Sequence, residues 1–386
     1  MKRLSLCVGL IAALSLSLAS APVRASDIDE IVFFGDSLSD TGNIWFALGG
    51  VPGLPYFQGS NGAAPEYTGG QWSSPEGPSW PTLFASRFGL MATPSLASLV
   101  GAPEVNNYAF GGARTGINGD PSGAPWLDQQ VAIYAASLGG NPAPEGTLVS
   151  IMIGGNDVAN NLGDDEALAA GITSITTQIN NLYGLGVRQF LIANVPDIGA
   201  TPRFQDIDAG APGTAAFATF KTAQWNTALK EALAQLNLPG AVIDDFDFFT
   251  FGKNPELLAG FANTTDACLT ETSLCANPAS YFYWDSFHPS STSHALLAEG
   301  LSQTLVPTRL QQLLDDVTGV GPGRFLERTV KWAQRAYARD RVRATCGALR
   351  IFQFTVKLLS YRRLNDEQAN RFTSHAETIR EALSCH

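Results

Sequence analysis

Residues 31–43 read IVFFGDSLSDTGN: four apolar residues, a Gly-Asp pair, and then Ser37. The apolar run is bounded by turn-forming residues, which predicts a short buried strand at Ile31–Phe34. In open parallel sheets, ligands bind just beyond the carboxyl ends of the strands. Ser37 is therefore a candidate nucleophile, although a Ser in this position also commonly caps a helix.

Three segments far downstream carry the other groups that an acyl-transfer site needs. They read NYAFGG at Asn107–Gly112, GGND at Gly154–Asp157 and DSFH at Asp285–His288. Together with Ser37 they supply a nucleophile, oxyanion donors and a general base with its orienting carboxylate. One four-residue string recurs by chance, so the prediction depends on all four segments.

We expect His288 to be the general base, because it precedes a proline in a loop where its ring is free of helix packing. Asp285, three residues earlier, faces the same side of a tight turn and can orient the imidazole. Gly112, Asn156 and the N–H of Ser37 are the expected oxyanion-hole donors. Ordinary turn formation and N-capping remain the structural alternatives for these residues.

Three nearby residues are given structural roles, and a fourth is an alternative donor. Asp36 and Asp157 flank the motifs and are expected to support or cap them rather than to react. His294 lies within a helical run and is expected to be a helix-surface or core residue. Gly111 is the one-residue alternative to Gly112 as a donor.

Short apolar runs alternate with helical patterns, which predicts an α/β fold with a parallel sheet covered by helices on both faces. The expected strands are Ile31–Phe34, Val105–Tyr108, Leu148–Ile153, Gln189–Val195 and Ala241–Phe246. Helices are expected near Asp164–Tyr183, Thr214–Leu236 and Ser291–Val306. Because Ser37, Gly112 and Asn156 each follow a predicted strand, this topology gathers them at one edge of the sheet.

With four such segments in this order, the chain resembles GDSL-type lipases and esterases of the SGNH hydrolase superfamily over roughly Ile31–Leu301. NVPDIG at Asn194–Gly199 and the run Asn254–Pro289 are most similar to the branch with secreted bacterial lecithinase- and hemolysin-like enzymes. The resemblance implies a flavodoxin-like sheet, a Ser-His-Asp acyl-enzyme mechanism, and no metal or cofactor. It also implies that loop carbonyls can share the orienting role of Asp285.

The leading function is hydrolysis of carboxylic esters, foremost acyl-lipid esters, by a serine esterase or lipase. Acyl transfer from a phospholipid to an alcohol and deacetylation of a carbohydrate remain open alternatives for the same site. A binding protein on an inactive hydrolase fold is a remote alternative, since Ser37, Asn156 and His288 are all present. The acyl-chain length, the acceptor and the oligomeric state stay open.

The N-terminal residues have the pattern of a secretory signal peptide. Lys2 and Arg3 precede the apolar run Leu4–Ala21, and Val23–Ala25 is a small-x-small cleavage site. We therefore expect residues 1–25 to be removed, with a mature chain that starts near Ser26 and is extracellular or periplasmic. A retained anchor is disfavoured because the apolar run is short and lacks a stop-transfer flank.

Four cysteines remain beyond Cys7, and an oxidising compartment favours their pairing. They allow three connectivities. Cys268–Cys275 and Cys346–Cys385 are the expected disulfides, because each pair then stays inside one domain. No four-ligand spacing typical of zinc is present.

The chain is divided by TGVGPG at Thr318–Gly323, which reads as a linker between a hydrolase domain at 26–317 and a helical module at 324–386. Asn365 and Gln368 predict a capping box for the last helix. A small C-terminal helical module of this kind, with a Cys before its central helix and another at its end, resembles modules appended to diverse bacterial extracellular proteins.

Charge differs sharply between the two parts. Residues 318–386 hold 13 Lys and Arg against 6 Asp and Glu, a net of +7, whereas residues 26–317 hold 8 against 29, a net of −21. The acidic part disfavours nucleic acid and anionic membrane surfaces as direct partners. The basic module could contact an anionic surface or the acidic part itself, and a solvated helical face is the plain alternative.

The segment Ile44–Pro81 is rich in Gly and Pro and lacks periodicity. Its aromatic residues predict an ordered wall beside the nucleophile rather than disorder, with a passive surface cover as the alternative. These residues are Tyr56, Phe57, Tyr67, Trp72 and Trp80.

Overall fold

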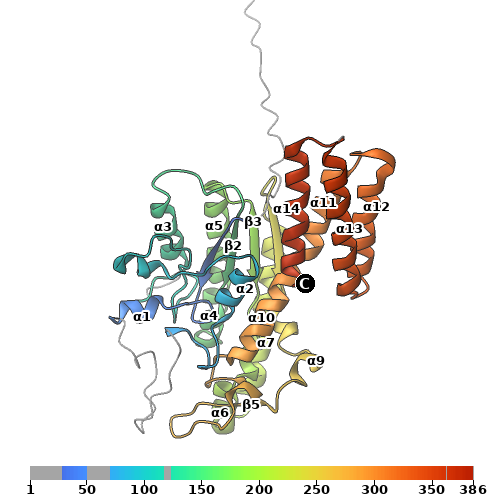
Figure 1. The fold of residues 1–386 in the computed structure, drawn as a ribbon. Helices are drawn as coiled ribbons and strands as arrows, with labels where there is room; N and C mark the ends of the chain where they lie inside the picture. Colours follow the sequence, from blue (N-terminus) through green and yellow to red (C-terminus); the bar gives the residue numbers. More distant parts are fainter. Residues whose placement is uncertain (1–27, 50–69, 117–122, 362, 386) are drawn as a thin grey trace, which may run out of the picture.

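The computed structural model describes residues 28–49, 70–116, 123–361 and 363–385. Its centre is a parallel sheet in the order β1-β2-β3-β4 (Figure 1). The predicted signal peptide lies outside the described residues, as do Tyr56, Phe57 and Tyr67. The strands are β1 (Glu30–Gly35), β2 (Thr147–Met152), β3 (Gln189–Ala193) and β4 (Val242–Phe246).

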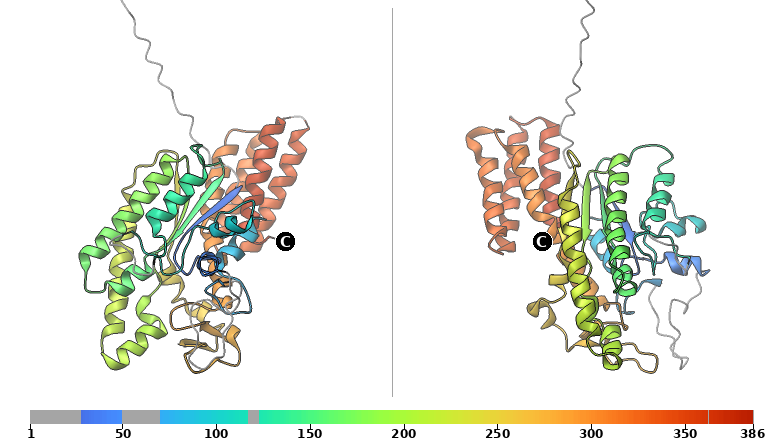
Figure 2. Two further views of the ribbon diagram at one scale, coloured as in Figure 1. Left: turned by 90° about the vertical axis from the view of Figure 1, so that its left-hand side faces the viewer. Right: turned by 180° about the vertical axis from the view of Figure 1, so that it is seen from behind.

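Alternate residues of the strands enter two separate cores, as both faces of a covered parallel sheet require. Val32 and Phe34 pack with α3 (Leu127–Ser137), α5 (Asp165–Gly184) and α7 (Thr214–Ala234), whereas Phe33 packs with α2 (Trp80–Arg87) and α10 (Ser291–Thr304). Figure 2 shows helices on both sides of the sheet. The prediction of an α/β sheet sandwiched by helices is confirmed.

The predicted strand at Val105–Tyr108 is wrong as a full strand. Only an isolated bridge pairs Asn107 with Phe33 of β1, flanked by backbone hydrogen bonds of 2.9 and 2.8 Å. The backbone N–H of Asn106 bonds to the carbonyl of Thr93 at 3.1 Å and not to β1, while the side-chain amides of the Asn-Asn pair bond to backbone carbonyls. Asn106 donates to the carbonyl of Ile31, and Asn107 to that of Ser39.

Several short helices and 3-10 turns lie in the segments that connect the strands and long helices. The shorter helices are α1 (Asn43–Ala47), α4 (Gly155–Asn160), α6 (Pro202–Gly210), α8 (Phe248–Phe251) and α9 (Pro255–Leu258). A second, two-stranded sheet pairs β5 (Asn263–Ala267) with β6 (Tyr281–Tyr283). 3-10 turns occur at Ser95–Val100, Ile198–Ala200, Pro278–Ser280 and Pro322–Arg324.

A four-helix bundle forms the C-terminal part of the molecule (Figure 1). It comprises α11 (Val306–Val317), α12 (Phe325–Tyr337), α13 (Val342–Ser360) and α14 (Asp366–Ala382). Helix α11 packs against α12 and α14, so the bundle includes a helix that precedes the predicted linker. Leu310 and Leu313 belong to one core with Val330 and Phe372 of the bundle and with Phe33 of the sheet. The bundle thus packs onto the α/β part directly.

Both expected disulfides are present in the structure. Cys268 and Cys275 have Cα atoms 4.8 Å apart, and Cys346 and Cys385 have Cα atoms 5.6 Å apart. The first closes a loop that packs on Trp72, and the second ties α13 to the residues after α14. Within the described part of the chain, no helix is both long and apolar enough to cross a membrane.

Candidate active site

Ser37 lies in the tight turn that follows β1. The carbonyl of Asp36 accepts the N–H groups of Ser39 and Asp40, each at 3.0 Å, and its carboxylate accepts the N–H of Leu38 at 3.0 Å. Burial raises the pKa of Asp36 to about 7. Asp36 therefore shapes the turn that presents Ser37, which matches the supporting role expected for it.

A chain of hydrogen bonds joins Ser37, His288 and Asp285. His288 Nε2 lies 2.8 Å from Ser37 Oγ, and His288 Nδ1 lies 2.7 Å from Asp285 Oδ2. Burial alone would raise the pKa of Asp285, but the charge and hydrogen bonds of His288 and the N–H of Phe287 lower it below its ordinary value. A carboxylate held ionised in this position can stabilise an imidazolium.

The segment after Asn107 is held against the nucleophile turn. Asp40 Oδ2 accepts the N–H of Gly111 at 2.9 Å, and Asn156 Nδ2 donates to the carbonyl of Ala113 at 3.0 Å. The N–H of Gly111 is thus already used. Gly112 has φ of +79°, and among the described residues its N–H and that of Ser37 have no hydrogen-bond partner.

Asp40 and Asn43 organise this region, although neither was predicted to have a role. Besides Gly111, Asp40 accepts the N–H groups of Gly42 at 2.8 Å and Asn43 at 2.6 Å. Burial raises the pKa of Asp40 to about 6, and these donors oppose the rise. Asn43 Nδ2 reaches the carbonyl of Asn107 at 2.9 Å. Both residues lie in the DTGN segment that ends residues 31–43, and its turn-forming residues were the sequence feature that could have indicated this role.

Asp157 supports the same region from α4. Its carboxylate accepts the hydroxyl of Thr115 at 2.6 Å, and burial raises the pKa of Asp157 above its ordinary value. This fits the supporting role that the sequence indicated.

Trp72 and His294 form a second layer behind His288. The Trp72 and His288 rings are 4.7 Å apart between centroids with planes 30° apart, and a Cβ on Gly111 would come within 2.6 Å of the indole. His294 Nε2 donates to the carbonyl of Trp72 at 3.1 Å, while its Nδ1 accepts the N–H of Trp80 at 3.3 Å. Burial lowers the pKa of His294 to about 4. His294 is therefore a neutral core residue, one of the two positions expected for it.

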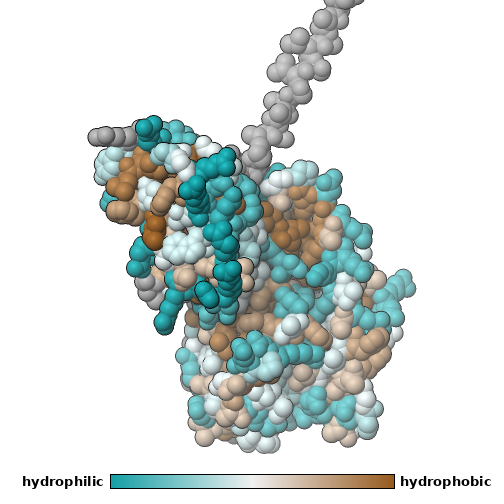
Figure 3. All heavy atoms as spheres, turned by 90° about the vertical axis from the view of Figure 1, so that its right-hand side faces the viewer, coloured by the Kyte–Doolittle hydropathy of each residue, from teal (hydrophilic) through white to brown (hydrophobic). Residues whose placement is uncertain are grey.

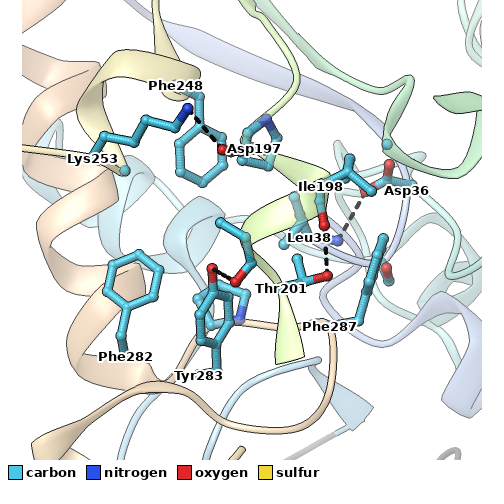
Figure 4. A pocket seen from close by; sticks show the side chains of 16 residues that line it. Asp36, Leu38, Asp197, Ile198, Thr201, Phe248, Lys253, Phe282, Tyr283 and Phe287 are labelled. Atoms are coloured by element: carbon cyan, nitrogen blue, oxygen red, sulfur yellow. Dashed lines mark hydrogen bonds and ion pairs between the residues drawn. The ribbon is translucent and has the colours of Figure 1, made fainter. Parts of the chain in front are cut away.

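A narrow pocket adjoins Ser37 and is lined mostly by apolar side chains (Figure 4). Its volume is about 60 Å³. Phe287 and Leu38 lie on one side of the view, and Phe248 and Lys253 on another. Lys253 Nζ pairs with Asp197 Oδ2 at 2.7 Å, so this wall carries an ion pair rather than a lone charge. The remaining apolar lining includes Pro196, Ile198, Ala200, Phe282, Tyr283 and Pro289.

The site residues offer no metal-binding set. Among the described residues, no group of three or more His, Cys, Asp and Glu side chains is arranged to hold a metal ion.

Known proteins are similar in sequence to the part of the chain that carries this site. The family model of GDSL-like lipases/acylhydrolases matches residues 31–301. The chain is 27% identical to thermolabile hemolysin of Vibrio parahaemolyticus over 74% of this chain and 65% of that protein. It is 28% identical to a GDSL esterase/lipase of Arabidopsis thaliana, over 44% of this chain and 53% of the relative.

An acetylesterase of Thermothelomyces thermophilus is 31% identical over 47% of this chain and 58% of the relative. The chain thus spans between about half and two thirds of the length of these curated relatives. The family model covers well over half of the chain, including all four segments at the site. The chain belongs to the family of GDSL-like lipases/acylhydrolases.

Proposed function

We propose that this protein is a secreted serine esterase or lipase that hydrolyses carboxylic esters through an acyl-enzyme. The observation that carries the proposal is the hydrogen-bonded chain from Ser37 Oγ through the His288 ring to Asp285, at 2.8 and 2.7 Å. These are the contacts by which a general base activates a hydroxyl and a carboxylate orients that base.

In the proposed reaction, His288 Nε2 takes the proton of Ser37 Oγ as the oxygen attacks the ester carbonyl. Asp285 stabilises the imidazolium that forms, and the imidazolium then gives its proton to the departing alcohol. A water molecule activated by the same imidazole attacks the acyl-serine and releases the acid. Ser37 is regenerated at the end of each cycle.

The negative charge that develops on the carbonyl oxygen needs donors that are already in place. The N–H groups of Ser37 and Gly112 and the amide of Asn156 are assigned this role. Two facts support it: the N–H of Gly111 is occupied by Asp40, and Asn156 is held beside the same segment through Ala113. Gly112 is thereby favoured over Gly111.

The pocket beside Ser37 is assigned to the acyl group of the ester. Its walls are Phe248, Phe282, Phe287 and other apolar residues, and the charge of Lys253 is paired with that of Asp197. Such walls favour a hydrocarbon chain, and the small volume favours a short one. The similarity to an acetylesterase supports deacetylation as a second candidate for the same site.

Secretion is supported by the two disulfides, which persist in oxidising compartments. The N-terminal segment with Lys2, Arg3 and the cleavage pattern Val23–Ala25 is proposed to direct it.

A substrate series tests the proposed function. The secreted protein is incubated with p-nitrophenyl acetate, butyrate, octanoate and palmitate, with phosphatidylcholine, and with acetylated xylan. We expect the highest kcat/KM on a short- or medium-chain acyl ester. Activity confined to acetylated xylan would select the carbohydrate esterase. Inactivity of the folded protein on every ester would exclude an ester hydrolase.

A further inference from the structure

An apolar stripe runs along the outer face of α13 in the C-terminal bundle. Ile351, Phe354, Leu358 and Tyr361 follow one another at helical spacing of three and four residues, which places them on one face. Their exposed fractions are 43%, 63%, 54% and 74%. The opposite face of the same helix is fully engaged in the core, where Phe352 is 0% exposed. The side chains of the stripe therefore do not form part of the core of the bundle.

The neighbouring helix α12 adds large exposed apolar side chains. Phe325 is 50% and Trp332 is 42% exposed, and α12 packs along α13. Figure 3 looks at this side of the molecule and shows hydrophobic residues gathered on the lobe that these helices form, next to a column of hydrophilic ones. Clustered exposed apolar side chains of this kind mark interaction surfaces.

The charge of the same two helices is strongly positive. Residues 325–363 contain ten Lys and Arg and two acidic residues. One of the two, Glu327, is largely buried and pairs with Lys331 at 2.5 Å. Helix α13 itself has Arg343, Arg350 and Lys357 and no acidic residue. The apolar stripe is thus flanked by cationic side chains on a part of the chain with a positive net charge.

The shape and lining of this surface favour a lipid bilayer over a docked peptide as its binding partner. The hollow between α13 and α14 beside Phe354 has a mixed lining, with the charged and polar Arg350, Gln353 and Lys357 next to apolar residues. A mixed lining of this kind is not the continuous apolar groove that docks the apolar face of a peptide helix. Protruding Phe, Leu and Tyr side chains next to Arg and Lys instead match an interfacial helix, whose apolar groups enter a bilayer while its cations meet phosphates.

We propose that the outer face of α13, together with α12, docks this protein peripherally on a lipid surface rich in anionic phospholipids. Long-range charge orients the molecule for that contact. Residues 26–317 carry a net of −21 and are repelled from such a surface, whereas residues 318–386 carry +7 and are attracted. The proposal does not depend on the esterase activity, because none of its residues lines the site at Ser37.

Vesicle co-sedimentation tests the docking surface. The full secreted chain, carrying Ser37→Ala so that lipid stays intact, is mixed with vesicles of phosphatidylcholine alone or with added phosphatidylglycerol. We expect binding that requires phosphatidylglycerol and weakens as salt rises. Phe354→Ser/Leu358→Ser should weaken that binding at least about tenfold, because each change removes one apolar side chain from the bilayer. Arg350→Glu/Lys357→Glu should weaken it comparably.

Phe217→Ser/Phe220→Ser is the matched control, because these residues of α7 are 44% and 54% exposed but lie outside the bundle. It should bind vesicles normally, and thermal unfolding should confirm that all variants are folded. Equal binding of the control and of Phe354→Ser/Leu358→Ser would overturn the proposal. So would a lack of vesicle binding with self-association that depends on Phe354 and Leu358, since the stripe would then join two copies of the chain.

Discussion

At the scale of single residues, the proposed chemistry separates groups that touch the reacting atoms from groups that hold them. Ser37 and His288 form the first set, and Asp285 belongs to the second because it holds the His288 ring through Nδ1. Asp36, Asp40 and Asn43 also belong to the second set, because each bonds to backbone groups of the surrounding turns.

Asn156→Ala should lower kcat far more than it raises KM. An oxyanion donor acts on charge that exists only in the transition state, and the loss of one such donor typically costs about 10²–10³-fold in rate. The measurement is steady-state hydrolysis of p-nitrophenyl butyrate. Asn160→Ala on the same helix is the control, since Asn160 is exposed and its amide donates to the carbonyl of Asn156 at 2.7 Å. An effect of Asn156→Ala on KM alone would contradict the assignment.

His294 should make stability depend on pH below neutrality. Burial lowers the pKa of His294 from 6.5 to about 4, so between these values the unfolded chain binds more protons than the folded one. The contribution of His294 to the free energy of unfolding is fully present above pH 6.5. About 3 kcal/mol of it is lost as the pH falls to about 4. Asp36 and Asp40, whose pKa values are raised, act in the opposite direction.

Urea unfolding of the native protein and of His294→Gln at several pH values isolates this term. The carboxyl groups are common to both proteins and cancel in the difference. We expect the free energy of unfolding of the native protein to exceed that of His294→Gln by less as the pH falls from 6.5 to about 4. A difference that stays constant with pH would show that His294 does not titrate as described.

The site residues were largely predictable because each is read from a short local string after a strand. Trp72 was expected only as part of a wall beside the nucleophile, and His294 only as a helix-surface or core residue, so their contacts behind His288 were not predicted. Their roles arise from contacts with residues 216 and 222 positions apart along the chain, namely Trp72 with His288 and His294 with Trp72. Neither residue has a local pattern that sets it apart from an ordinary core aromatic or histidine.

At the scale of elements, helices with strong end signals were predictable. Asp164 caps α5, and Asn365 with Gln368 forms the capping box of α14. The expected helix Ser291–Val306 corresponds to α10, which ends at Thr304. Helix α11 was not predicted. It begins at Val306, and Pro307, which lacks an N–H, lies in its first turn.

The two disulfides should have different consequences when they are removed. Cys346→Ser/Cys385→Ser opens a link across 39 residues of the bundle and should lower stability by about 2–4 kcal/mol, without changing kcat/KM on a soluble ester. Cys268→Ser/Cys275→Ser should lower activity, because that pair packs on Trp72, which lies against His288. Denaturant unfolding and p-nitrophenyl butyrate turnover decide both points. Activity loss only in the Cys346/Cys385 variant would reverse this assignment.

At the scale of the whole molecule, an acidic α/β part with the site is packed against a basic helical bundle. The interface has an apolar core and also includes hydrogen bonds. Tyr337 of α12 donates to the carbonyl of Gln303 in α10 at 2.8 Å, and Arg87 of α2 donates to Ser384 at 2.6 Å. The charge division between the parts was readable from the sequence. The packing of α11 with the bundle was not, because it depends on which helix faces meet in three dimensions.

The central claim is that Ser37 carries the acyl group during ester hydrolysis. The most direct measurement incubates the native protein with p-nitrophenyl butyrate, quenches it in acid during turnover, and maps the modified peptide by mass spectrometry. We expect a butyryl group on Ser37, and no such group and at least about a 10³-fold lower turnover in folded Ser37→Ala. Near-normal turnover by Ser37→Ala, or a butyryl group on another residue of a fully active protein, would contradict the account.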